Sequence, residues 1–225
     1  MSEEKRTIHI KGTGQVTQAP DTVVLSLRLT SNNPEYSATM KIGSQQIELL
    51  REAIIEAGFE ADDLKTTNFN VRAVYEDEEV RDGNSKHYRQ NFVGFECVHD
   101  LKLMFDMSNY KLHSAIDAIA KCLSEPKISI AFAVSDTDAL TDKILKAAAR
   151  EAKRKAKVLC TAAGVKLGNL IRIDYPCDES DSRCKIRANE QMVLGVSTDD
   201  EINFDFEPED IIATDSANFI WEIVD

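Results

Sequence analysis

Glu151 and Lys155 are the ionisable pair in this sequence whose spacing best suits chemistry. They stand four residues apart, acid before base, inside a long helical pattern, which is the favourable order for an ion pair on one helix. Both fall on or beside the apolar side of that pattern. We interpret them as a half-buried structural pair in which the lysine stem lies along apolar surface. A functional lysine with a depressed pKa is the alternative.

The cysteines offer two further arrangements. Cys97 and His99 lie two apart on the apolar side of a strand pattern, which suits two metal ligands, but no second pair at suitable spacing follows. We interpret them as a buried thiol beside a hydrogen-bonded histidine. Cys177 and Cys184 lie seven apart among acids, too far for a zinc knuckle, so they are interpreted as free thiols; reversible oxidation to a local disulfide is the alternative.

Other motifs favour structure over catalysis. Gly12 and Gly14 resemble a nucleotide-binding loop, but the third glycine is missing and a strand pattern follows, which favours a bulge or a close strand crossing. The acidic run from Glu76 to Glu79 lies at a hairpin tip and lacks the convergent geometry of a cation site. The four histidines give no nucleophile, base and orienting acid. We therefore expect no catalytic, metal-binding or cofactor-binding residues and no cofactor.

The longest helical pattern runs from Asp136 to Gly164, with acceptors at its start and glycine at its end. Its predicted inward side is rich in alanine, so we expect it to lie flat and close on a sheet. That side comprises Leu140, Ile144, Ala148, Ala152, Leu159 and Ala162. The opposite side carries a basic stripe, the candidate interface, made of Lys143, Lys146, Arg150, Lys153 and Lys157.

Alternating and helical patterns place the remaining elements around this helix. Two strands come first, followed by a helix from Asn33 and Pro34 to Gly58 with Tyr36 inward, and by a long hairpin from Phe69 to Phe105. A shorter helix (109–123) and a strand (128–134) precede the long helix, and two strands close the chain. The predicted order is β-β-α-β-β-α-β-α-β-β in a single domain, 1–225, with an irregular polar excursion at about 177–205.

Composition excludes several classes of protein. The 225 residues are 43% hydrophobic, enough for a sizeable core, and carry a formal net charge of −12, which disfavours nucleic-acid binding. No apolar run approaches the length of a membrane span. The N-terminus lacks the pattern of an export signal, and five cysteines cannot all pair. We expect a cytoplasmic protein, or an envelope protein if a leader has been removed.

The ordered motifs resemble those of the SIMPL domain family from about residue 7 to 224. They are Ile10, Gly12, Gly14 and Val16 before Pro20-Asp21, Gly94-Phe95 before Leu101 and Leu103, Phe132 and Asp136 before Ala152, Lys155, Ala156 and Leu159, the run AAGVKLG, and Pro208-Glu209-Asp210. The resemblance implies an α+β fold with a mostly antiparallel sheet packed by three helices, and assembly into oligomers, in some relatives rings. It also implies kinship with bacterial envelope proteins linked to oxidative stress and with a eukaryotic kinase-binding protein. The family has no established catalytic residues to transfer.

Three functional hypotheses follow. The first is a non-enzymatic, self-associating binding or scaffold protein, in which the basic stripe contacts another copy or a partner with an acidic surface. The second is a thiol-based redox-responsive or oxidative-stress protein acting through Cys177 and Cys184 or through Cys97. The third is an enzyme of unknown reaction centred on Glu151 and Lys155.

Overall fold

The computed structural model describes residues 6–82, 85–175, 185–187, 192–194 and 206–225. These residues belong to two compact units. Unit 1 combines the N-terminal stretch to Pro20 with segments 133–189 and 208–225, and unit 2 combines Asp21–Phe132 with 190–207. That the whole chain is one domain stays a prediction. Among the described residues, no helix has the length and apolar character needed to cross a membrane.

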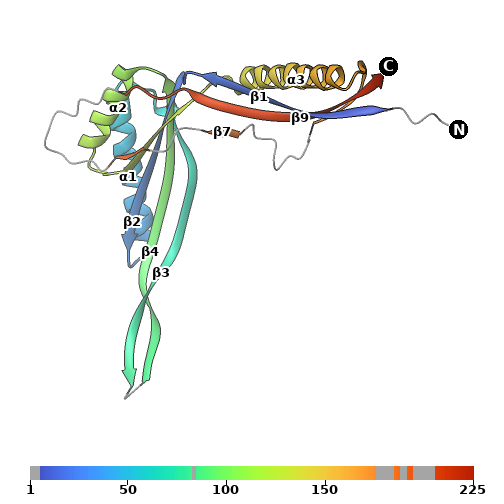
Figure 1. The fold of residues 1–225 in the computed structure, drawn as a ribbon. Coiled ribbons are helices and arrows are strands. Elements are labelled where there is room, and N and C mark those ends of the chain that lie inside the picture. Colours follow the sequence, from blue (N-terminus) through green and yellow to red (C-terminus); the bar gives the residue numbers. More distant parts are fainter. Residues whose placement is uncertain (1–5, 83–84, 176–184, 188–191, 195–205) are drawn as a thin grey trace. The chain divides into compact units, whose positions relative to one another are not determined.

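Unit 1 is an antiparallel sheet covered by one long helix, α3 (Figure 1). Strand β9 (Ile211–Val224) lies between β1 (Thr7–Gln18) on one side and β6 (Lys166–Asp174) on the other, and the short β7 (Lys185–Arg187) also pairs with β9. Helix α3 spans Thr137–Ala162. The Asp136 side chain accepts a hydrogen bond from the Ala139 amide at 2.8 Å, so the predicted N-terminal cap is confirmed.

Helix α3 approaches its sheet closely because the facing residues are small. A Cβ atom added at Gly14 would lie 1.9 Å from the Ile144 carbonyl oxygen, and one at Gly12 would lie 2.3 Å from that of Ala148. Ala148, Ala152 and Ala156 are fully buried on the helix side. The two glycines thus mark a close crossing, but the element that crosses β1 is helix α3 and not a strand as predicted from the sequence.

The inward side of α3 differs from the prediction near its C-terminus. Leu159 is 51% exposed and Ala162 is also exposed, whereas Ala156 and Cys160 are buried in their place. The buried residues advance in strict four-residue steps from Leu140 to Cys160, a row inclined to the helix axis. Because the strands beneath the helix twist, the residues that stay in contact with them lie along an inclined row and not along a line parallel to the helix axis.

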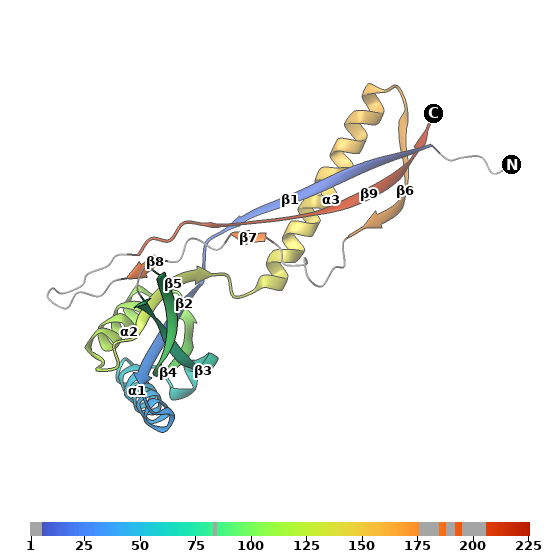
Figure 2. The ribbon, with the colours of Figure 1, turned by 90° about the horizontal axis from the view of Figure 1, so that it is seen from below.

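Unit 2 is a second sheet, ordered β3-β4-β2-β5-β8, with two helices packed on it (Figure 2). The strands are β2 (Thr22–Asn33), β3 (Leu64–Asp82), β4 (Ser85–Asp106), β5 (Lys127–Ala133) and β8 (Met192–Leu194), and the helices are α1 (Tyr36–Glu56), α2 (Asn109–Lys121) and the short 3-10 helix η1 (Ala61–Asp63). Its core is built of large aliphatic side chains. They include Leu25, Leu27, Leu29, Leu50, Ile54, Leu101, Leu103, Leu112 and Ile119, none more than 2% exposed.

The start of α1 also differs from the prediction. Asn33 is the last residue of β2, and its side-chain oxygen accepts a hydrogen bond from the Glu35 amide at 3.0 Å instead of capping the helix. Helix α1 begins at Tyr36, which is 53% exposed, so its predicted inward position was wrong. Thr39 is the buried residue of this turn, with its hydroxyl donating to the Glu35 carbonyl at 2.9 Å.

The predicted α+β class and the order of the main elements are confirmed, and the strands form two antiparallel sheets. The described part of the excursion adds the two short strands β7 and β8, one to each sheet. In the predicted hairpin, Leu64–Asp82 pairs with Ser85–Leu103, so strand pairing continues through the charged tip.

Candidate interaction surfaces

The basic stripe of α3 is exposed to solvent in unit 1. Lys143, Lys146, Arg150, Lys153 and Lys157 are all exposed. Among the described residues, Lys143 Nζ donates to Gln18 Oε1 of β1 at 3.1 Å, and Lys146 Nζ lies 3.4 Å from Asp142 Oδ2 on the same helix. Exposed pairs of this kind contribute little to stability, so these two contacts do not account for the charge of the stripe.

Arg154 extends this basic surface, and sequence reasoning missed it. Lys146, Arg150 and Arg154 follow one another at four-residue steps, and Arg154 is exposed like the other two. The row is inclined to the helix axis in the same way as the buried row beneath it. The four-residue step was the signal that would have found Arg154.

Glu151 and Lys155 form the predicted ion pair, and Glu151 also binds the backbone of the neighbouring strand. Lys155 Nζ lies 3.0 Å from Glu151 Oε1, and the side chains are 41% and 29% exposed, respectively. The Thr13 amide of β1 donates to Glu151 Oε2 at 2.7 Å. That backbone hydrogen bond, followed by the one from Lys155, lowers the pKa of Glu151. The carboxylate therefore ties α3 to β1 and is a poor general base.

Cys97 and His99 lie on the same face of β4, buried in unit 2. Burial raises the pKa of the Cys97 thiol, although its hydrogen bond with Ser31 acts in the opposite direction. His99 Nε2 is 2.9 Å from Thr66 Oγ1, and burial, followed by the charge of Arg51, lowers the pKa of His99. A buried thiol with a raised pKa is unreactive at neutral pH, which argues against a redox role for Cys97. Cys177 and Cys184 lie outside the described residues.

No metal centre accompanies these side chains in the part of the chain that the structure describes. There, no group of three or more His, Cys, Asp or Glu side chains is placed to hold an ion. One surface hollow of about 420 Å³ on unit 2 is bordered by Arg28 and Asp100, whose side chains pair at 2.6 Å. That hydrogen bond is the largest cause lowering the pKa of Asp100. We therefore interpret Asp100 as the structural partner of Arg28.

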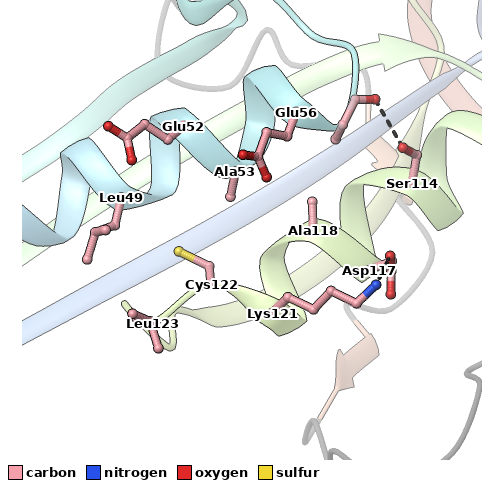
Figure 3. A pocket seen from close by; sticks show the side chains of 11 residues that line it. Leu49, Glu52, Ala53, Glu56, Ser114, Asp117, Ala118, Lys121, Cys122 and Leu123 are labelled. Carbon is pink, nitrogen blue, oxygen red and sulfur yellow. Dashed lines mark hydrogen bonds and ion pairs between the residues drawn. The ribbon is translucent and has the colours of Figure 1, made fainter.

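A groove of about 370 Å³ lies between α1 and α2 (Figure 3). Its floor is apolar: small residues lie on the helices or just after their ends, and two exposed leucines add to them. These residues are Ala53, Ala57, Ala118, Cys122, Leu49 and Leu123. Acids stand at its rim: Glu52 and Glu56 from α1 and Asp117 from α2. Asp117 is neutralised by Lys121, at 2.7 Å, whereas Glu52 and Glu56 are exposed and form no ion pair with any described residue. Sequence reasoning missed this groove because it depends on how the two helices pack.

The β3–β4 hairpin carries an exposed run of aromatic rings. Phe95 contacts Tyr36 and Phe92 with ring centroids 5.4 and 5.3 Å apart, and Phe92 contacts Tyr75 at 5.7 Å. Tyr36, Tyr75 and Phe92 are each more than half exposed. A register shift between Val74 and Tyr75 pairs Tyr75 with Phe92 and so extends the run along the hairpin.

Comparison with known proteins identifies one family. The SIMPL family, described as "Protein of unknown function (DUF541)", matches residues 8–221 of the chain. No curated protein matches the chain.

Proposed function

Because the chain belongs to the SIMPL family, whose description assigns no activity, we propose its function from its surfaces: a non-enzymatic binding protein that associates with itself. The basic stripe of α3 provides one side of the contact. The acidic surface of another copy provides the other, and a partner protein with an acidic surface fits the same stripe. The association holds copies together through charge and orients them, and no covalent step is involved.

The observation that carries this proposal is an exposed basic helix face on an acidic chain. Lys143, Lys146, Arg150, Lys153 and Lys157 are exposed on α3, while the net charge is −12. Copies of a protein with that charge repel one another at long range. A local patch of opposite sign then decides which surfaces meet, because charge complementarity sets orientation and suppresses wrong contacts.

Analytical ultracentrifugation of the full chain over a range of concentrations tests the proposal at low and at high salt. We expect self-association at low salt that weakens at high salt, because exposed charges are screened within about 10 Å at 0.1 M salt. The variant K146E/R150E/K153E should associate at least about tenfold more weakly. A chain that stays monomeric at every concentration in low salt would exclude the proposed function.

A matched control separates the stripe from net charge. The variant K65E/R89E/K127E changes the charge by the same amount at three exposed basic residues of unit 2, on β3, β4 and β5. It should retain association within about threefold of the unmodified chain, because its changes lie outside the proposed contact. Equal loss in both variants would mean that only total charge matters, which the proposal does not allow.

A further inference from the structure

Helix α1 carries an acidic row of three residues, two of which, Glu52 and Glu56, line the groove between α1 and α2. Glu48, Glu52 and Glu56 stand at four-residue steps, are exposed, and form no ion pair with the residues that the structure describes. Residues four apart on one helix lie on the same side of it, with a rise of about 6 Å between successive members. Unit 2 therefore presents a straight row of unneutralised carboxylates.

The groove gives this row a floor that suits long side chains. Ala53 of α1 faces Ala118 of α2 and the adjoining Cys122, and Glu52 and Glu56 lie on the same helix as Ala53 (Figure 3). Arginine and lysine bury their methylene stems on apolar surface while their charged ends reach polar partners. Leu49 and Leu123, both exposed, add apolar surface to the lining, and Lys121 of the lining pairs with Asp117. A groove with an apolar floor and the carboxylates of Glu52 and Glu56 at its rim thus fits lysine and arginine side chains, whose stems are apolar and whose ends are charged.

The matching row is on the same chain. Lys146, Arg150 and Arg154 repeat at the same four-residue step on the exposed side of α3. We propose that the groove between α1 and α2 receives α3 of a second copy, with these three residues along Glu48, Glu52 and Glu56. This inference rests on the proposed function and names the surface that meets the basic stripe.

The contact joins two different surfaces, and that determines how copies assemble. Each copy offers one basic row on unit 1 and one acidic groove on unit 2. Such an interface is heterologous, so copies add head to tail and either close into a ring or continue as a filament. A contact between two identical patches would stop at a dimer instead.

Two full-length variants test the pairing directly. K146Q/R150Q/R154Q removes the basic row and E48Q/E52Q/E56Q removes the acidic row, while glutamine keeps the helix propensity of both surfaces. Each variant alone should associate at least about tenfold more weakly than the unmodified chain. An equal mixture should form a dimer of one copy of each and nothing larger, because one complementary pair of surfaces remains. Trp221 fluorescence checks the fold of unit 1, which carries the basic row, and circular dichroism and hydrogen exchange check that of unit 2, which carries the acidic row.

A third variant controls for the other acidic surface of unit 2. E76Q/D77Q removes two exposed carboxylates from the β3–β4 hairpin and should leave association unchanged. Association abolished by this variant and retained by E48Q/E52Q/E56Q would overturn the groove assignment and place the contact on the hairpin. A mixture of the two row variants that stays monomeric would overturn it as well.

The outcomes also separate this inference from the proposed function. Loss of association on removing the basic row, with no loss on removing the acidic row, leaves self-association standing and rejects the groove. Absence of association in the unmodified chain rejects both. A single chain carrying K146E/R150E/R154E and E48K/E52K/E56K exchanges the charges, and recovery of association in it supports the pairing of these rows.

Discussion

The two units cover their sheets with helices in opposite ways. In unit 1, α3 meets β1 through Gly12 and Gly14, with backbone and alanine atoms at the contact. In unit 2, α1 and α2 meet the sheet through leucine and isoleucine side chains, including Leu50, Ile54 and Leu112, all fully buried. Close approach therefore determines the packing of unit 1, and side-chain volume determines that of unit 2.

This difference indicates which contacts stabilise each unit. An alanine buries little apolar area at about 25 cal/mol per Å², so α3 gains less from its inward side chains than α1 does. Unit 1 adds polar contacts between helix and strand, of which the Thr13 amide bonded to Glu151 is the clearest. Substitutions that add volume should harm unit 1 most, and substitutions that remove volume should harm unit 2 most.

The largest effect is expected for Gly14→Val in unit 1. Its side chain would need space now occupied by the Ile144 carbonyl, 1.9 Å from the position of the Cβ atom, and backbone cannot yield as a side chain can. We expect a loss of about 4 kcal/mol or more in the free energy of unfolding. Fluorescence of Trp221, the sole tryptophan and a residue of unit 1, reports the unfolding of that unit.

Thr17→Val is the control for Gly14→Val. Thr17 is exposed on the same strand, so valine there should change stability by no more than about 0.5 kcal/mol. If Gly14→Val proved as stable as Thr17→Val, the close crossing of α3 over β1 would be wrong.

Leu101→Ala tests whether large buried side chains stabilise unit 2. Leu101 is 1% exposed in the core of unit 2, and removing its side chain leaves a cavity that its neighbours fill only in part. We expect a loss of about 3 kcal/mol, detected by faster hydrogen exchange in the strands of unit 2. Met104→Ala, at a position 48% exposed on the same strand, should cost less than about 1 kcal/mol. Equal losses in the two variants would show that volume is not what holds unit 2.

Glu151→Gln tests the polar tie of unit 1. Glutamine keeps an acceptor for the Thr13 amide but loses the charge that strengthens that bond and pairs with Lys155, so we expect a loss of about 1.5 kcal/mol. Asp142→Asn is the control, because Asp142 pairs with Lys146 on the exposed side of the same helix; its effect should stay below about 0.5 kcal/mol.

The same carboxylate predicts a dependence on pH. The pKa of Glu151 in the folded chain lies below its ordinary value of 4.5. Its stabilising contribution is therefore complete above the ordinary pKa and is lost as the pH falls through the lowered one. Acid titration of the unfolding free energy should show a smaller decline for Glu151→Gln than for the unmodified chain. Parallel declines would contradict the assignment.

Features with a local cause were predictable from the sequence. Asp136 and Gly164 mark the ends of α3 because capping depends on a few neighbouring residues. The Glu151–Lys155 pair follows from helical spacing alone. In each case the sequence within one or two turns contains the whole physical cause.

Features that depend on how elements pack could not be predicted from the sequence. Alternating patterns predict strands but do not tell which strands share a sheet, so the division into two sheets came only from the structure. The burial of Ala156 in place of Leu159 depends on the twist of the sheet beneath α3. The groove required the positions of α1 and α2, and Asn33 failed as a cap because β2 extends to include it.

The smallest predicted effect concerns the one feature that the two units share. Each long helix is followed two residues later by a glycine in the left-handed conformation: Gly164 after α3, with φ +73°, and Gly58 after α1, with φ +92°. Each end has the same hydrogen bonds: Gly164 to Thr161 and Val165 to Cys160 in unit 1, and Gly58 to Ile55 and Phe59 to Ile54 in unit 2. A Cβ atom at either glycine would meet nothing within 4 Å, so only the left-handed backbone opposes a side chain.

Gly164→Ala and Gly58→Ala should therefore cost the same, about 1 kcal/mol each, in units that respond so differently elsewhere. Asparagine, which tolerates this conformation, should cost less than alanine at both positions. Chemical denaturation followed by circular dichroism and hydrogen exchange measures all four variants. Equal losses of stability would mean that the two units differ only in how their helix faces pack on the sheets. A several-fold difference would mean that the helix ends differ as well.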